Sequence, residues 1–106
     1  IIPGDMGRAT YVLVGTERAL EEAFGSVCHG AGRLMSRTQA RQGRQSKDVI
    51  AQLKAKGVIA RASSREGLTE EVPEAYKSID EVIEAVTGAG LARAGAALKT
   101  VGSVKG

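Results

Sequence analysis

Apolar and β-branched residues gather in short runs at three places along the chain, and each run predicts a strand. The run from Ala9 to Val14 ends at Gly15 and predicts a buried strand. Val58 to Ala62 predicts another short strand, and the tail from Val101 to Val104 predicts a terminal strand. Extended structure is therefore expected near the start, in the middle and at the end of the sequence.

Helices are predicted where a capping residue comes before apolar residues at helical spacing. Thr16 and Ser46 are expected to act as single N-caps. Ser36 and Ser78 are followed three positions later by Gln and by Glu, which is the capping-box pattern. The predicted helices are Glu17–Phe24, Arg37–Gln42, Lys47–Lys56 and a helix from Ile79 to near Gly88.

The remaining segments lack a clear hydrophobic period. Pro3–Gly7 has the composition of a turn, and Ser26–Gly32 is expected to be a loop whose backbone can approach a ligand closely. Ser63–Pro73 is expected to be a polar loop, whereas the small residues of Leu91–Leu98 predict a further short helix. The order of these elements makes the fold class mixed α/β (α+β), in a single unit without an internal boundary.

Composition limits the size of the core and the cellular environments that suit the protein. The 106 residues allow one core, and only Tyr11, Phe24 and Tyr76 are aromatic. No apolar run approaches the ~18 residues of a membrane span, so no membrane association is expected. The single cysteine, Cys28, cannot form an internal disulfide, which is compatible with a cytoplasmic protein. Ile1–Gly4 contains no initiator methionine and begins no signal peptide, so the chain is expected to be a fragment.

Charge is distributed unevenly, although the net charge is only +3. Positions 27 to 61 carry eight basic residues against one acidic residue, Asp48, whereas positions 62 to 98 carry seven acidic and three basic residues. A basic stretch of this kind favours a surface that faces a polyanion, with a solvated helix face as the alternative. The eight basic residues are Arg33, Arg37, Arg41, Arg44, Lys47, Lys54, Lys56 and Arg61.

The candidate chemistry centres on His29, the only histidine, in a glycine-containing loop that precedes Arg33 and Arg37. A neutral imidazole can attack phosphorus, the N–H groups of flexible glycines can cradle phosphate, and arginine binds phosphate through paired hydrogen bonds. Nucleotidyl transfer through a histidine requires these three parts, although a lone histidine is more often structural or merely exposed. Cys28 adjoins His29, but no second cysteine or histidine can complete a metal site, so no metal ligand is expected in this chain.

The segment Cys28–Arg37, CHGAGRLMSR, resembles the signature of the RtcB family of RNA-splicing ligases. Ile2–Gly7, Tyr11–Glu17 and Val104–Gly106 match the same family in the same order, so the resemblance covers the whole chain. It corresponds to the C-terminal part of a much longer enzyme. The resemblance therefore implies part of the larger RtcB-type fold and not a complete independent architecture.

The resemblance also implies an activity, which is the ligation used in tRNA splicing and RNA repair. His29 matches the histidine that attacks the α-phosphate of GTP, with Mn²⁺ assistance, to form a histidine–GMP phosphoramidate. GMP then passes to an RNA 3′-phosphate, itself derived from a 2′,3′-cyclic phosphate, and the 5′-hydroxyl of a second RNA displaces it. GTP and Mn²⁺ are the implied cofactors, and RNA is the implied partner.

Further site residues follow from the same resemblance. Arg33 and Arg37 are expected to face phosphates of the RNA or the nucleotide, and the basic span from Arg41 to Arg61 is expected to extend the RNA track. Some relatives carry serine where this chain has Asp5, and a carboxylate accepts a hydrogen bond from guanine but cannot donate one. The implied nucleotide-binding residues are Pro3, Gly4, Asp5, Met6, Thr10, Gly30, Ala31, Gly32, Tyr76 and Lys105.

The family's manganese ligands lie upstream of the matched segment, so the missing upstream part of the ligase is an expected partner. The chain alone is expected to be inactive. Two other interpretations stay open: a non-catalytic basic RNA-binding module, in which the His29 loop holds phosphate, and an α/β interaction piece without a ligand.

Overall fold

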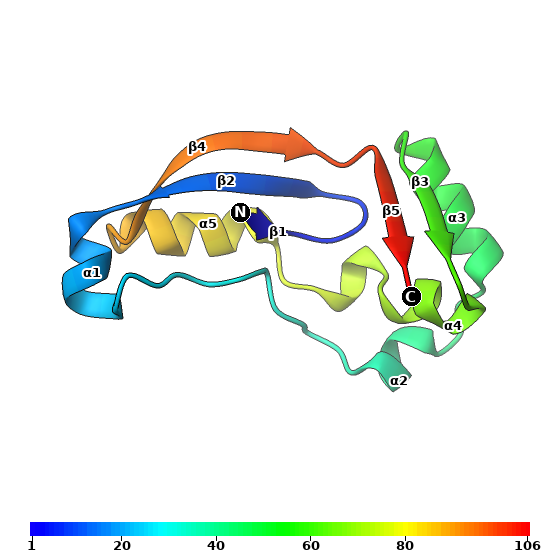
Figure 1. Ribbon diagram of the computed structural model, residues 1–106. Coiled ribbons are helices and arrows are strands. Elements are labelled where there is room, and N and C mark those ends of the chain that lie inside the picture. Colours follow the sequence, from blue (N-terminus) through cyan, green and yellow to red (C-terminus); the bar gives the residue numbers. More distant parts are fainter.

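Two small sheets and five α-helices make up the chain in the computed structural model, which describes residues 1–106 (Figure 1). Strands β1 (Ile2–Pro3), β2 (Ala9–Gly15) and β4 (Ala92–Lys99) form an antiparallel sheet in the order β1-β2-β4. Strands β3 (Ile59–Ala62) and β5 (Gly102–Lys105) form a separate parallel pair. The helices are α1 (Glu17–Ala23), α2 (Arg37–Arg41), α3 (Ser46–Ala55), α4 (Arg65–Glu70), the 3-10 helix η1 (Pro73–Ala75) and α5 (Ile79–Gly88). The mixed α/β class is confirmed.

The three predicted strands are confirmed as β2, β3 and β5, with ends that differ by at most one residue. Strand β2 was expected to be buried, but it is half-buried, and its last two residues, Val14 and Gly15, are exposed. The short strand β1 was not predicted, because two residues are too few to show the alternation of apolar and polar positions that is typical of a strand. It forms because Ile2 pairs with Tyr11 while its side chain enters the core.

The prediction of a helix over Leu91–Leu98 is wrong, because this segment is the strand β4. Alanine favours helix intrinsically, but β4 pairs with β2 along its whole length, from Ala92 opposite Gly15 to Lys99 opposite Ala9. The register shifts between Val12 and Leu13, and a Cβ at Gly95 would lie 3.2 Å from the carbonyl oxygen of Val12. Tertiary pairing outweighs the local preference of the small residues here.

The prediction of a polar loop over Ser63–Pro73 is also wrong, because it contains α4. The Ser64 side chain caps this helix by accepting a hydrogen bond from the Gly67 N–H at 3.1 Å. Only Leu68 and Thr69 of the helix are buried, so six residues give too short an apolar stripe to read from the sequence.

Three of the four predicted capping residues are N-caps in the structure, and two of these three make the capping hydrogen bond with their side chains. Ser36 forms its capping box with Gln39, and Thr16 accepts a hydrogen bond from Ala19 N–H at 3.3 Å. Ser46 instead lies inside α3, after an N-cap residue whose side chain makes no capping bond. Ser78 is the N-cap of α5, but its side chain makes no capping hydrogen bond either.

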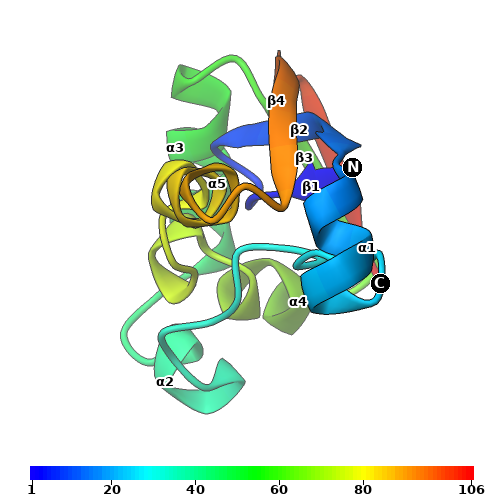
Figure 2. The same ribbon diagram turned by 90° about the vertical axis from the view of Figure 1, so that its left-hand side faces the viewer.

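The core consists of two separate clusters in a molecule that measures 46 × 26 × 21 Å. At one end α5 packs beside β2 and β4, where the view along the long axis shows it end-on (Figure 2). The cluster there comprises Ile2, Ala31, Ile79 and Ile83. The cluster at the other end comprises Met6, Ala40, Val49, Leu53, Val58, Leu68, Val72 and Ala75.

Several large apolar side chains lie outside both clusters. Phe24 is 99% exposed after α1, while Ile59 on β3 and Val104 on β5 are 69% and 83% exposed. Side chains alternate along each strand, so the β3–β5 pair turns one apolar face outward and the opposite face toward α4. No helix of the structure has both the length and the apolar character needed to cross a membrane.

Candidate functional site

His29 is presented by a loop that runs back along the molecule from α1 to α2 (Figure 1). Helix α1 ends at Phe24, which adopts the left-handed conformation with φ of 53°, and this reversal directs the chain into the loop. Ala31 is only 5% exposed and anchors the loop in the Ile79 cluster. His29 precedes that anchor by two residues and is itself exposed. The histidine is therefore accessible, although the loop that carries it is held in place.

Backbone hydrogen bonds fix the second half of this loop to the segment that follows η1. The Leu34 N–H donates to the Ala75 carbonyl oxygen at 2.8 Å, and the Lys77 N–H donates to the Gly32 carbonyl oxygen at 3.0 Å. Gly32 has φ of 76°, a conformation that favours glycine, and it has no neighbour on the side where a Cβ would project. The backbone around Gly32 is thus both ordered and open to a ligand.

The turn between β1 and β2 lies directly against the His29 loop. A Cβ at Gly30 would lie 3.5 Å from the Pro3 carbonyl oxygen, so the two backbones approach closely at this point. The Gly4 N–H donates to the Ala9 carbonyl oxygen at 3.1 Å, and Pro3 is paired with Thr10. The structure therefore brings Gly30 to the start of the chain, beside Pro3, which adjoins Gly4 and pairs with Thr10.

Asp5 and Met6, in the same turn, can offer a ligand little beyond their backbones. The Met6 side chain belongs to the larger core cluster. The Asp5 side chain is fully buried, and its Oδ1 accepts a hydrogen bond from the Gly7 N–H at 2.9 Å. Burial raises the pKa of Asp5, while the Gly7 hydrogen bond and Arg8, whose Nε is 3.4 Å from Oδ2, oppose that rise. A contact between the Asp5 carboxylate and guanine stays a prediction.

A second group of predicted residues meets around Glu71, at the end of α4. Arg33 Nη1 donates to Glu71 Oε1 at 3.1 Å and to the Tyr76 hydroxyl at 3.0 Å. Its Nη2 donates to the Glu70 carbonyl oxygen at 2.6 Å, and its guanidinium carbon lies 4.9 Å from the centroid of the Tyr76 ring. The Tyr76 hydroxyl donates to the other Glu71 oxygen, Oε2. Arg33 is therefore held by its hydrogen bonds and by a cation–π contact.

Arg37 and Lys105 complete this group, which we call the Glu71 cluster: Arg33, Arg37, Glu71, Tyr76 and Lys105. Arg37 Nε lies 3.9 Å from Glu71 Oε1, and Lys105 Nζ lies 3.7 Å from Glu71 Oε2. Lys105 reaches the cluster because the alternation along β5 turns it toward the half-buried side of the strand. The two arginines converge through Glu71 and not along one helix, because α2 begins only at Arg37.

The electrostatics of the Glu71 cluster favour a carboxylate that stays ionised. Burial disfavours the charged form of Glu71, but the Tyr76 hydrogen bond and the three cations outweigh burial and lower its pKa. Burial raises the pKa of Tyr76, and its hydrogen bond to Glu71 raises it further. Three cations face Glu71, and Arg37 also lies 3.7 Å from Glu70 Oε2, so three cations against two carboxylates leave a small local excess of positive charge.

Sequence reasoning missed Glu71. Its position was expected to be in a polar loop, and two adjacent glutamates before Val72 and Pro73 give no distinctive signal. No hydrogen bond or ion pair links His29 to Glu71. The predicted site residues therefore form two groups, one around His29 and Pro3 and the other being the Glu71 cluster, and the loop from Gly30 to Arg33 joins them. Cys28 is half-buried beside the Ile79 cluster.

No three or more histidine, cysteine, aspartate or glutamate side chains come together in an arrangement that could hold a metal ion. His29 and Cys28 have no carboxylate completing a set with them. These 106 residues therefore do not provide a fit for manganese, and no metal ligand is assigned among them.

Comparison with known proteins gives consistent results over the whole chain. The family model described as tRNA-splicing ligase RtcB matches residues 1–106. Over those 106 residues the chain is 47% identical to the tRNA-splicing ligase RtcB of Methanopyrus kandleri and to that of Archaeoglobus fulgidus. It is 50% identical to the RNA-splicing ligase RtcB of Mycobacterium tuberculosis. The chain spans 11%, 22% and 24% of the lengths of these three curated relatives, so it corresponds to a segment of a larger protein.

Proposed function

Because the chain belongs to the RtcB family, whose relatives are named as tRNA- or RNA-splicing ligases, we propose that it carries the nucleophile and part of the guanylate pocket of an RNA ligase. The ligase joins RNA ends that bear a 3′-phosphate or a 2′,3′-cyclic phosphate to ends that bear a 5′-hydroxyl. His29 is the nucleophile. The proposal extends the family assignment to a chemistry and to individual residues.

The proposed reaction has three displacements at phosphorus. A nitrogen of His29 attacks the α-phosphorus of GTP, an N–P bond forms, and pyrophosphate leaves. An oxygen of the RNA 3′-phosphate then attacks the same phosphorus, which breaks the N–P bond and returns the electron pair to the imidazole. Finally the 5′-hydroxyl oxygen of the second RNA attacks the 3′-phosphate, GMP leaves, and the hydroxyl proton is released.

The observation that carries this proposal is the approach of the His29 loop to the turn after β1. Gly30 and Pro3 are close enough that a Cβ at Gly30 would contact the Pro3 carbonyl oxygen, so one nucleotide can touch both segments. The accessible His29 side chain adjoins this contact, because it directly precedes Gly30, and Pro3 is followed by Gly4 and paired with Thr10. The open backbone at Gly32 supplies N–H groups of the kind that cradle phosphate.

The Glu71 cluster supports phosphate and base recognition beside the nucleophile. Arg37 is proposed to bind phosphate of the nucleotide or the RNA, because guanidinium groups bind phosphate through paired hydrogen bonds. Arg33, whose guanidinium already donates to Met35, Glu70, Glu71 and Tyr76, is proposed to contribute its positive charge to the same phosphate. Lys105 is proposed to contact the base or the ribose, and Tyr76 to stack near the guanine. Glu71 keeps these side chains in place by accepting from Tyr76 and Arg33.

Manganese is proposed to be held by the part of the ligase that this chain does not include, because these residues provide no ligand set for it. When bound, such an ion offsets negative charge on the phosphates. The chain alone is accordingly proposed to be inactive, and the rest of the ligase to be its partner.

Guanylylation of His29 tests the proposal directly. The full-length ligase is incubated with Mn²⁺ and GTP radiolabelled at the α-phosphate, then separated under denaturing conditions, with acid treatment of a parallel sample. We expect acid-labile label on the unaltered protein and on a Cys28→Ala control, and none on His29→Ala. Label that persists on His29→Ala would show that another residue is the nucleophile.

The second candidate function is a non-catalytic RNA-binding module, which the basic side chains favour. In that case neither the unaltered protein nor its variants are labelled, and His29→Ala reduces phosphate or RNA binding only in part. The same samples, measured for RNA binding by filter retention, separate the two candidates.

A further inference from the structure

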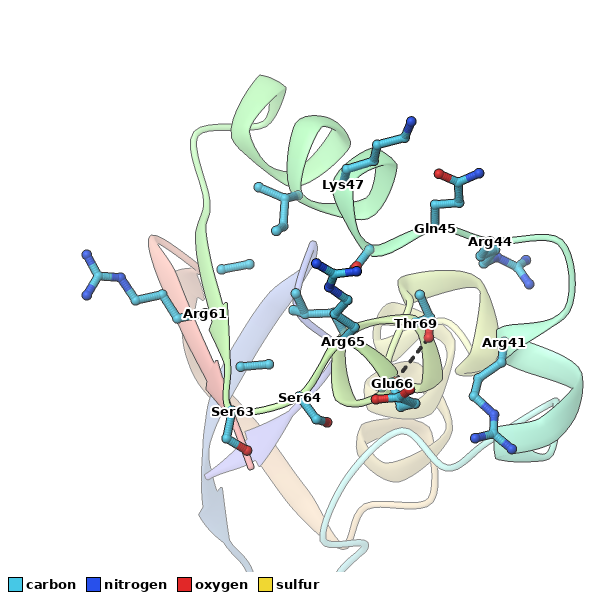
Figure 3. A pocket seen from close by; sticks show the side chains of 15 residues that line it. Arg41, Arg44, Gln45, Lys47, Arg61, Ser63, Ser64, Arg65, Glu66 and Thr69 are labelled. Carbon is cyan, nitrogen blue, oxygen red and sulfur yellow. Dashed lines mark hydrogen bonds between the residues drawn. The ribbon is translucent and has the colours of Figure 1, made fainter.

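A large cavity opens at the end of the molecule remote from α1, between α3, β3 and α4 (Figure 3). Its volume is about 1010 Å³. Side chains of Ile50, Ala60, Ala62 and Leu68 contribute the apolar part of the wall. None of the residues implied to bind the nucleotide lines this cavity, but four of its basic residues lie in the span from Arg41 to Arg61 that the sequence suggests extends the RNA track.

The charged residues that line the cavity are almost all basic. They are Arg41, Arg44, Lys47, Arg61 and Arg65, against one acidic residue, Glu66. Figure 3 shows Arg65 reaching into the middle of the cavity, with Arg44 and Lys47 along its rim, whereas Arg61 points away. The direction of Arg61 follows from the alternation along β3, which turns Ala60 and Ala62 inward.

Two of the basic side chains that line the cavity have no acidic partner within this chain. Lys47 and Arg65 are exposed and take part in none of the ion pairs of the structure. Arg44 donates to the Ala40 carbonyl oxygen at 2.8 Å, which fixes its side chain but leaves its charge uncompensated. Concentrated positive charge in a concave wall attracts an anion more strongly than the same charge on a flat surface.

Glu70 links the cavity to the Glu71 cluster, because it pairs with a basic residue from each. Arg41 lies at its edge, and Arg41 Nη1 is 3.4 Å from Glu70 Oε1. Arg37 Nε is 3.7 Å from the other oxygen of the same glutamate, Oε2. Basic side chains therefore follow one another from the Glu71 cluster through Arg37 and Arg41 to Arg44 and Arg65.

We propose that this cavity, which we call the Arg65 cavity, binds backbone phosphates of the RNA substrate several nucleotides away from the reacting end. The inference rests on the proposed ligase function and adds a second substrate contact to it. Basic side chains bind the phosphates, and the apolar wall packs against ribose. RNA is favoured over a single small anion because the basic row is longer than one phosphate and leads toward the candidate site.

The test compares RNA binding by the full-length ligase with Arg65→Gln, Lys47→Gln, or both. Each variant removes one charge without touching a hydrogen bond of the structure. For a long single-stranded 3′-phosphorylated RNA, each lost phosphate contact flattens the slope of log K against log salt concentration by about 0.7. A 3′-phosphorylated dinucleotide, too short to reach the cavity, should bind all proteins equally.

Arg93→Gln is the matched control, because Arg93 is exposed on β4, at the opposite end of the molecule (Figure 1). It removes the same charge and should leave RNA binding and its salt slope unchanged. Radiolabelling of His29 by GTP is measured on every variant and should also be unchanged. If the unaltered ligase is not labelled, the proposed function fails, while the RNA-binding comparison still tests the cavity.

Two results would overturn the inference. One is an Arg65→Gln, Lys47→Gln double variant that binds the long RNA with the affinity and salt slope of Arg93→Gln. The other is a double variant that needs more GTP for labelling while binding RNA normally, because the cavity would then serve the nucleotide and not the RNA.

Discussion

The two ends of the molecule differ in how they combine packing and charge. The end that contains β2, β4, α1 and α5 has a cluster of four buried residues, an alanine-rich exposed strand and few ion pairs. The end that contains α2, α3, α4 and the β3–β5 pair has a cluster of eight and most of the ionic contacts. The candidate site lies where they meet. The larger cluster lies at the end where Glu70 and Glu71 hold four cations close together.

The first prediction contrasts the two clusters. Leu53→Ala in the larger cluster should lower the free energy of unfolding by about 4 kcal/mol, and Ile83→Ala in the smaller one by about 2 kcal/mol, within the range for buried truncations. Leu53 is 2% exposed in a cluster of eight buried residues, whereas Ile83 is 6% exposed in a cluster of four, so its truncation removes fewer buried contacts. Denaturant unfolding measures both, with the half-exposed Leu98→Ala as control. Equal losses at Leu53 and Ile83 would remove the distinction between the ends.

The second prediction concerns the junction of the two ends, at Gly4. A Cβ there would lie 2.6 Å from the Ala9 carbonyl oxygen, and a backbone atom cannot rotate away. Gly4→Ala should therefore lower the free energy of unfolding by about 3 kcal/mol, which is the upper part of the range for overpacking. Gly88→Ala, where a Cβ meets nothing within 4 Å, should be neutral or stabilising. Thermal unfolding compares the two, and a Gly4→Ala variant as stable as the parent would contradict the close approach.

The third prediction tests the ionic end through pH. The pKa of Glu71 is lowered in the folded state, so its contribution to stability is complete above its ordinary value of 4.5. That contribution is lost as the pH falls below 4.5 through the lowered pKa. Glu71→Gln should lower the free energy of unfolding by about 1 to 2 kcal/mol at neutral pH, because Tyr76 and Arg33 lose an ionised acceptor. The variant should also lose less stability than the parent as the pH falls below 4.5, a part of the pH profile that we call the acid limb.

Glu84→Gln is the control for the Glu71 variant. Glu84 is exposed on α5 and forms no ion pair, so its replacement should change neither the stability nor the acid limb. Denaturant unfolding at a series of pH values gives both quantities. A Glu71→Gln protein with the acid limb of the parent would show that the cluster does not depend on an ionised carboxylate.

The fourth and smallest effect compares one helix cap at each end. Thr16→Ala should cost about 1 kcal/mol or somewhat more, because Thr16 both caps α1 and donates to the Gly90 carbonyl oxygen at 2.7 Å. Ser36→Ala should cost about 1 kcal/mol or less, because its capping box is exposed and local. Thermal unfolding ranks the two, and a larger loss at Ser36 would contradict the ranking.

Prediction from the sequence succeeded where the signal was local. The capping box at Ser36, the apolar stripe of α5 and the run that forms β2 each depend on neighbouring residues. It was wrong for β4, where pairing with β2 overrides the helix preference of alanine. It was also wrong for α4, whose single buried leucine gives too little periodicity.

The candidate site shows the same difference between local patterns, which the sequence reveals, and long-range contacts, which it does not. The motif around His29 and the turn at Pro3 were visible as residue patterns, and the structure brings the two segments together at Gly30. Glu71 was not foreseen, because nothing in local spacing indicates that α2, α4, η1 and β5 will present their side chains to one carboxylate. The roles of all these residues remain predictions until the labelling experiment is done.

The pairing of β2 with β4 also has a consequence for the time course of folding. Its contacts join residues about as far apart as the chain permits, as in the hydrogen bond from Thr100 to the Arg8 carbonyl oxygen across 92 positions. Pairings of such high contact order form slowly, after local helices. Lys105 follows β4 and joins the Glu71 cluster only when β5 docks. The candidate site should therefore be among the last parts of the chain to mature, well after α3 and α5 have formed.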